Sequence, residues 1–168
     1  MNKILLGDSQ EVLKTIGDDT VHLTCTSPPY YNARSYSIWP TYEEYLQFLT
    51  NVFEQVLRVT KPGRMCAVNL SPVIQARESR AHESKRLAIP FHFFSLMEKM
   101  GWSAQDLLCV GDAPNDLSMF EMAGWSVSVG TPFVDVRAAA DVVSPYPNSA
   151  TIAPLVDAIL AVHSAQNL

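Results

Sequence analysis

The apolar and polar positions along the chain alternate between strand-like runs and helix-like segments. Apolar side chains recur at helical spacing most regularly between about residues 41 and 60, and that segment ends at Lys61-Pro62-Gly63, where proline and glycine stop a helix. The other expected helices are 8–16, 89–100, 117–124, 134–140 and 152–162. The expected strands are 3–7, 21–26, 64–70, 107–110, 125–129 and 142–143.

Short strands that alternate with helices are typical of a parallel sheet covered on both faces. The pattern therefore predicts an α/β fold, a three-layer Rossmann-like sandwich with a mostly parallel sheet of about five to six strands and helices on both faces. The polar segment between Ser71 and about residue 85 is expected to be a surface loop.

Composition places the chain among ordinary globular domains. It has 168 residues, of which 48% are apolar and 17% charged, which is enough for one core. No apolar run approaches the length of a membrane span and no signal peptide precedes the first strand, so a cytoplasmic location without membrane contact is expected. Each of the three cysteines, Cys25, Cys66 and Cys109, lies in a strand-like run and is expected to be a buried thiol.

Charge divides the chain into two unlike parts. The net charge is −5, but residues 1–102 carry eleven basic and ten acidic side chains, whereas residues 103–168 carry one and seven. The first part includes a basic stretch that could contact phosphates or could simply be solvated. Its members are Arg58, Lys61, Arg64, Arg77, Arg80, Lys85 and Arg86.

The most unusual stretch is Thr-Ser-Pro-Pro-Tyr at 26–30, directly after the expected strand 21–26. Ligands bind at the carboxyl ends of strands in open α/β sheets. Each proline fixes φ and removes an N–H donor, so the carbonyl groups of Ser27 and Pro28 can serve as acceptors beside the ring of Tyr30. Acceptors next to an aromatic face suit the exocyclic amino group of a planar base.

This motif resembles the catalytic motif of the amino-methylating DNA methyltransferases, which act on cytosine N4 or adenine N6. The resemblance covers residues 1–101 and includes the segments Lys3–Ser9 and 42–70. It implies catalytic roles for Ser27, Pro28, Pro29 and Tyr30, DNA as partner and S-adenosylmethionine as cofactor. Asp8, which can also cap the helix 8–16, is a candidate cofactor contact.

Residues 105–162 are similar instead to the last part of the haloacid dehalogenase-like phosphatases. The motif Gly111-Asp112-Ala113-Pro114-Asn115-Asp116 stands at a strand end, followed by Met122-Ala123-Gly124 and by Arg137 to Val143. The resemblance implies that Asp112 binds Mg²⁺ with support from Asp116, because carboxylate oxygens suit that ion. A loop with a helix cap is the alternative interpretation.

Neither half has the complete set of residues of the family that it resembles. The phosphatase nucleophile needs an Asp-x-Asp motif, and the chain has none. The glycine-rich cofactor loop of the methyltransferases is missing too, since Gly111 is the only glycine in residues 106–116. Gly111 is therefore the second candidate cofactor contact beside Asp8. The sequence therefore predicts a chimera, by gene fusion, recombination or design, with a junction near 101–106.

We expect a single α/β domain, 1–168, assembled from a methyltransferase-like half, 1–101, and a phosphatase-like half, 102–168. Three functions remain open: a DNA amino-methyltransferase or its inactive remnant, an inert chimeric fold, or a Mg²⁺-binding phosphatase-like fragment. The missing cofactor loop favours inactivity. Bound cofactor would be S-adenosylmethionine or Mg²⁺, or none at all. Unpaired sheet edges would favour a homodimer.

Overall fold

The computed structural model describes residues 4–35, 37–75 and 84–166. The chain divides into two compact units, Met1–Met100 and Gly101–Leu168. The division lies at the edge of the junction that the sequence predicts. The expected α/β class is confirmed, because helices alternate with strands that are mostly parallel. In the described residues these strands form three small sheets of two, two and three strands, where one sheet of about five to six was expected.

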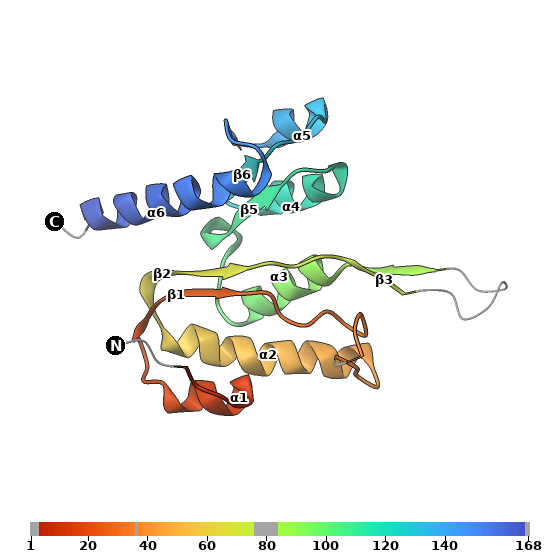
Figure 1. Cartoon of the computed structure of the whole chain (residues 1–168), viewed down its shortest axis with the longest axis vertical. Helices are drawn as coiled ribbons and strands as arrows, with labels where there is room; N and C mark the ends of the chain where they lie inside the picture. Colours follow the sequence, from red (N-terminus) through yellow and green to blue (C-terminus); the bar gives the residue numbers. More distant parts are fainter. Residues whose placement is uncertain (1–3, 36, 76–83, 167–168) are drawn as a thin grey trace. The chain divides into compact units, whose positions relative to one another are not determined.

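The first unit is built on one β–α–β crossover. Strand β1 (Val21–Thr26) pairs in parallel with β2 (Thr60–Val68), and helix α2 (Tyr42–Val59) connects them. Helix α2 lies along the strand pair, with the short helix α1 (Ser9–Val12) and the 3₁₀ turn η1 (Leu13–Thr15) on its far side (Figure 1). After β2 come an antiparallel hairpin, β3 (Val73–Gln75) and β4 (Lys85–Leu87), and helix α3 (Ile89–Lys99).

Helix α2 supplies most of the core of this unit. Its sequence places one apolar face along its length, and Thr41 caps its first turn by accepting a hydrogen bond from the Glu44 N–H. Phe53 of α2 meets Phe93 of α3 edge to face, with ring centroids 4.6 Å apart. Burial of each such side chain stabilises the fold by about 1.5–3 kcal/mol. The buried side chains are Tyr45, Leu49, Phe53, Val56 and Val59 of α2 and Ile89, Phe93 and Met97 of α3.

The second unit has a three-stranded parallel sheet of β5 (Leu108–Gly111), β6 (Trp125–Ser128) and β7 (Val142–Val143), in that order. Helices α4 (Leu117–Met122), α5 (Val134–Ala139) and α6 (Ile152–Gln166) alternate with the strands or follow them. Three 3₁₀ turns complete the unit, η2 (Ala104–Asp106), η3 (Pro114–Asp116) and η4 (Asn148–Thr151). Among the side chains whose burial the structure describes in this unit, Phe120, Val127 and Val136 are apolar and buried.

Three local predictions were wrong. No strand forms in the described part of 3–7, where Ile4 and Leu6 are 99% and 100% exposed, because no described strand pairs with it. Cys25 is exposed instead of buried, since a two-stranded sheet leaves part of its surface uncovered. The expected loop after Ser71 contains the described strands β3 and β4. No helix within the described residues is long and apolar enough to cross a bilayer.

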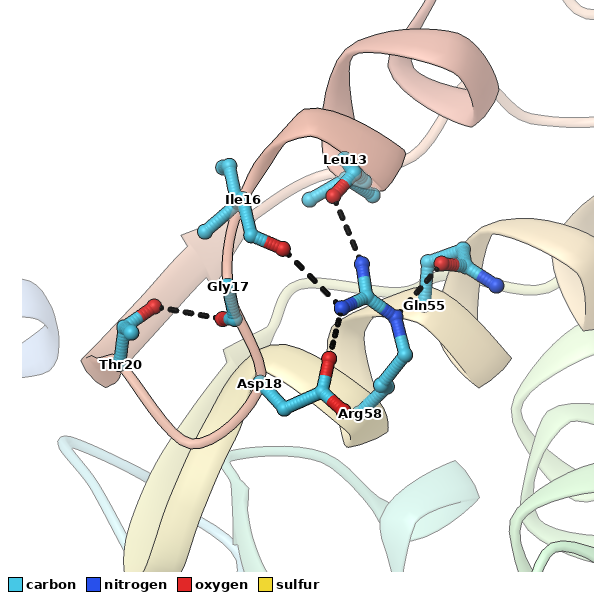
Figure 2. Close-up of polar contacts among 7 residues, drawn as sticks. All are labelled: Leu13, Ile16, Gly17, Asp18, Thr20, Gln55 and Arg58. Carbon is cyan, nitrogen blue, oxygen red and sulfur yellow. Dashed lines mark hydrogen bonds and ion pairs between the residues drawn. The ribbon is translucent and has the colours of Figure 1, made fainter.

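Arg58 fastens the turn before β1 to the end of α2. Its guanidinium donates hydrogen bonds to the carbonyl groups of Leu13 and Ile16, at 2.8 and 3.0 Å, and pairs with the Asp18 carboxylate (Figure 2). A cation at this position also complements the carboxyl end of the helix dipole. Arg58 was predicted to belong to a basic stretch that contacts phosphate or solvent. Its donors are used inside the fold.

We expect Arg58→Met to lower the free energy of unfolding by about 2–4 kcal/mol, because the carbonyl groups that it now satisfies would lose their charged donor. Urea unfolding measures the change. Lys14→Met is the matched control, because Lys14 and Glu11 form an exposed pair, 57% and 70% exposed, whose loss should cost at most about 1 kcal/mol. Equal effects of the two substitutions would contradict the role given to Arg58.

In the second unit, Ser126 and Asp141 tie β6 to the start of β7. One Asp141 oxygen accepts hydrogen bonds from the Ser126 hydroxyl at 2.7 Å and the Ser126 N–H at 2.8 Å. These bonds lower the pKa of Asp141 below its ordinary value. Their contribution to stability is therefore present above about pH 4 and is lost as the pH falls through the folded-state pKa.

Ser126→Ala is expected to destabilise the protein at pH about 7 and to differ less from wild type at pH about 2–3, because the Asp141 charge that accepts these bonds is progressively lost as the pH falls. Urea unfolding at the two pH values tests this. Ser118→Ala, at an exposed serine of α4, should leave the free energy of unfolding unchanged at both pH values. A Ser126→Ala defect that is the same at both pH values would contradict the role of the Asp141 charge.

Candidate functional site

The parallel pairing of β1 and β2 brings the predicted motif to the carboxyl edge of the sheet. The strands are in register from Leu23 opposite Met65 to Thr26 opposite Val68, and the Asn69 N–H then donates to the Thr26 carbonyl at 2.9 Å. Ser27 therefore lies beside Asn69, although the two are far apart in sequence. The position agrees with the rule that ligands bind where parallel strands end.

Three oxygen atoms converge at this edge. The Ser27 hydroxyl lies 3.4 Å from the Tyr30 hydroxyl, and each of these lies 3.4 Å from the carbonyl oxygen of Asn69. Hydrogen bonds between oxygens are normally about 2.7–2.8 Å long, so these contacts are weak and an incoming donor can displace them at small cost. We call this group of Ser27, Tyr30 and Asn69 the acceptor triangle.

The two prolines between Ser27 and Tyr30 make the motif rigid. Pro28 is buried, Pro29 is half-buried, and Ser27 is exposed at the end of β1. Fixed φ angles at two successive positions limit the motion of the residues on either side. The Ser27 hydroxyl can thus face a ligand without the motif having to reorganise.

Tyr30 is held by the loop that follows it. Its carbonyl oxygen accepts a hydrogen bond of 2.7 Å from the buried hydroxyl of Ser37 and another of 3.2 Å from the Ala33 N–H. Asn32, at φ 46°, accepts from the Trp39 N–H at 2.7 Å and donates to the Trp39 carbonyl at 3.2 Å. Asparagine tolerates this left-handed conformation better than most residues. The two bonds close the loop from 32 to 39.

Aromatic side chains fasten this loop to α2. Tyr31, which is 8% exposed, packs against Tyr42 and Tyr45, with ring centroids 5.1 and 5.6 Å away. Trp39 packs against Tyr45 from the other end of the loop, at 4.9 Å. The sequence left open whether Tyr31 and Trp39 line a site or cover the core, and the structure shows that they cover it. Tyr36 lies outside the described residues.

A cavity of about 410 Å³ opens beside the motif, between α1, α2 and the end of β1. Its wall is largely apolar, and Ser9, Thr24, Thr26 and Ser27 add hydroxyl groups to it. Small-molecule sites commonly have this size and composition. Asp8 falls between two lining residues, Gly7 and Ser9, but its carboxylate accepts a hydrogen bond from the Gln10 N–H at 2.8 Å and caps α1.

The cavity does not fit S-adenosylmethionine. That cofactor carries a sulfonium cation, an ammonium group and a carboxylate, and none of the described residues that line the cavity is charged. Burying unpaired charges against an apolar wall is costly. Gly111, the other candidate cofactor contact, has a structural reason to be glycine. A Cβ atom there would lie 2.6 Å from the Asp116 side chain.

Asp116 organises the loop after β5. One of its oxygens accepts hydrogen bonds from the N–H groups of Asp112 and Ala113, at 2.9 and 3.0 Å, and the other accepts from the Asn115 amide at 2.9 Å. Asp116 is 8% exposed, whereas Asp112 is exposed. Of the two carboxylates of this loop, that of Asp112 is the exposed one. No group of three or more potential ligands occurs in the described residues, so the loop does not fit Mg²⁺ as a complete site.

Sequence reasoning found the motif residues but missed Asn69, Asn32 and Ser37. Asn69 contributes a backbone carbonyl, and the register that brings it to Ser27 is a property of the folded sheet. Asn32 gave a weak signal, because asparagine is enriched among residues with positive φ.

Two groups of known proteins are similar to this chain. The haloacid dehalogenase-like hydrolase family matches residues 93–155. The type II β methyltransferase M.BslI of Bacillus sp. (strain NEB-606) is 34% identical over 107 residues, which are 62% of this chain and 12% of that protein. The type II methyltransferase M.BglII of Bacillus subtilis is 33% identical over 101 residues, 60% of this chain and 26% of that protein.

The chain is also similar to a solved structure, a candidate DNA modification methylase from Thermus thermophilus in complex with S-adenosyl-L-methionine. The two are 28% identical, with a TM-score of 0.47 over 57% of this chain and 39% of that one. The family match and the methyltransferase relatives confirm both resemblances that the sequence indicated. The chain spans about an eighth to a quarter of the two methyltransferases named above.

We predict that Asn32→Ala will open the loop that carries Tyr30. Loss of both hydrogen bonds to Trp39 should raise the rate of tryptic cleavage after the exposed Arg34 by about tenfold, as expected for about 1.4 kcal/mol of lost loop stability. Mass spectrometry of the fragments measures the rate. Asn51→Ala, which removes exposed side-chain bonds of α2, should leave cleavage unchanged. An unchanged cleavage rate in Asn32→Ala would show that the two hydrogen bonds between Asn32 and Trp39 do not hold the loop.

Proposed function

We propose that the first unit is the base-binding half of a DNA amino-methyltransferase and that it receives an exocyclic amino group at the acceptor triangle. The convergence of Ser27, Tyr30 and the Asn69 carbonyl at the end of two parallel strands carries this proposal. The similarity to type II methyltransferases supports it. The base would be cytosine or adenine, presented outside the helix.

The chemistry of the triangle fits an amino group better than a carbonyl. An amino group has two N–H donors in one plane, and the Asn69 carbonyl and the Ser27 hydroxyl can each accept one. Both hydroxyl groups can rotate, so Tyr30 can move from its 3.4 Å contact when a ligand enters. The fixed acceptor is the Asn69 carbonyl, which discriminates against bases that present an oxygen at the same place.

Methyl transfer is not part of the proposal. S-adenosylmethionine would supply the methyl group, but this chain has no glycine-rich loop, and the described residues around the cavity include no charged side chain to hold it. We infer an inactive methyltransferase-like protein in which a phosphatase-like segment follows the base-binding half. We also propose that the partner is DNA and that two ancestries join near 101–106. Assembly as a homodimer is a further prediction.

A Mg²⁺-dependent phosphatase activity is the alternative with less support. The Asp116 carboxylate is committed to its own loop, and no Asp-x-Asp nucleophile exists in the chain. The loop in the second unit therefore serves its fold, as a buried acid satisfying backbone donors commonly does. Burial, with a smaller effect of the Asp116 charge, also raises the pKa of the Cys109 thiol, which disfavours a reactive thiolate there.

The test uses duplexes with one bulged nucleotide, so that no recognition sequence is needed. Fluorescence anisotropy should show tighter binding to bulged cytosine or adenine than to bulged thymine, because thymine lacks the amino group. We expect the dissociation constants to differ by a factor of about ten, because the amino group makes two hydrogen bonds to an oriented pair of acceptors. Ser27→Ala with Tyr30→Phe should remove most of the discrimination, whereas Ser9→Ala, in the cavity wall, should retain it.

Equal affinity of the wild-type protein for all three bulges would contradict the amino-group site.

A separate measurement tests whether the protein is inactive as a methyltransferase. The same complexes incubated with S-adenosylmethionine should remain unmethylated, as mass spectrometry of the recovered oligonucleotide can show. Methylated product would mean that a cofactor site forms despite the uncharged cavity.

A further inference from the structure

The hairpin of β3 and β4 carries an apolar side chain and two cations on a narrow ribbon. Val73 pairs with Leu87, Ile74 with Arg86, and Gln75 with Lys85. Directly opposite residues of an antiparallel pair point to the same face. Ile74 and Arg86 therefore share one face of the ribbon, and Gln75 and Lys85 share the other with Val73 and Leu87.

The two faces differ in their surroundings. Val73 and Leu87 are half-buried, so the base of their face packs on the unit. Ile74 is 63% exposed beside the exposed Arg86, and Lys85 is exposed at the distal pair. The six described residues of the two strands include two cations and no acid. The exposed part of the hairpin thus offers a positive charge on each face and one apolar side chain.

The hairpin begins where the acceptor triangle ends. Strand β3 continues the course of β2 past the end of β1 (Figure 1), and only Leu70, Ser71 and Pro72 separate Asn69 from β3. Five residues from Asn69 to Ile74 span at most about 17 Å in extended form. That length is about half a turn of B-DNA, whose helical repeat is about 34 Å. A nucleotide in the triangle would place neighbouring phosphates within reach of the hairpin.

We propose that this hairpin is a DNA-contacting ribbon that grips the duplex beside the extruded nucleotide. Arg86 and Lys85 pair with backbone phosphates, and Ile74 contacts the bases next to the gap that the extruded nucleotide leaves. A two-stranded ribbon fits the major groove, where apolar side chains can contact the exposed edges of bases. The inference rests on the proposed function, because the position of the DNA follows from a base held at the triangle.

The test measures the salt dependence of binding to a bulged-cytosine duplex of about two helical turns by fluorescence anisotropy. The plot of log K against log salt has a negative slope. Arg86→Gln and Lys85→Gln should each make it shallower by about 0.9, as expected for one lost phosphate contact. Ile74→Ser should weaken binding about fivefold with an unchanged slope. Lys14→Gln removes the same charge at an exposed position of η1, and its slope and affinity should equal those of wild type.

The outcomes separate this inference from the proposed function. Wild-type slopes in both Arg86→Gln and Lys85→Gln would overturn the ribbon, even if bulged cytosine and thymine were still discriminated. Reduced slopes without base discrimination would support the ribbon and overturn the acceptor triangle. Absence of any duplex binding by the wild-type protein would overturn both. Thermal unfolding of each variant verifies that these exposed substitutions leave the fold intact.

Discussion

The parallel pairing of β1 with β2 is the constraint on which the first unit depends. It places Ser27 beside the Asn69 carbonyl, directs β3 away from the same edge, and leaves the cavity between β1 and α2. Helix α2 maintains the pairing, because its buried face supplies the core and its last turn carries Arg58, which fixes the turn entering β1. A parallel pair cannot form without such a crossover, so site and core are built together.

Elements with strong local patterns could be predicted from the sequence. The apolar run before Ser27 gave strand 21–26 with its observed bounds, and the helical spacing after Thr41 gave α2 to within one or two residues. Features that depend on pairing were missed or wrong. The position of Asn69 follows from strand register, and residues 4–7 have the apolar pattern of a strand but no described partner. A pattern shows what a segment can form, and neighbouring strands decide whether it does.

In the second unit, the motif at 111–116 has a structural role of its own. Gly111 leaves room for Asp116, and Asp116 satisfies the N–H groups of Asp112 and Ala113 that the turn would otherwise leave unpaired. Resemblance to a metal-binding motif therefore predicted the loop and its position at the end of β5 correctly. The ligand role depends on partners elsewhere in the chain, and those are what the sequence lacks.

Recognition of an amino group at the acceptor triangle is tested most directly by mapping amide chemical shifts while cytidine is added to the ¹⁵N-labelled protein in the absence of any cofactor. We predict saturable shifts at Ser27, Tyr30, Ala33 and Asn69, with much smaller shifts when uridine replaces cytidine, because uridine has a carbonyl in place of the amino group. Shifts of equal size with both nucleosides, or shifts confined to residues 111–116, would contradict the claim that the triangle recognises an amino group.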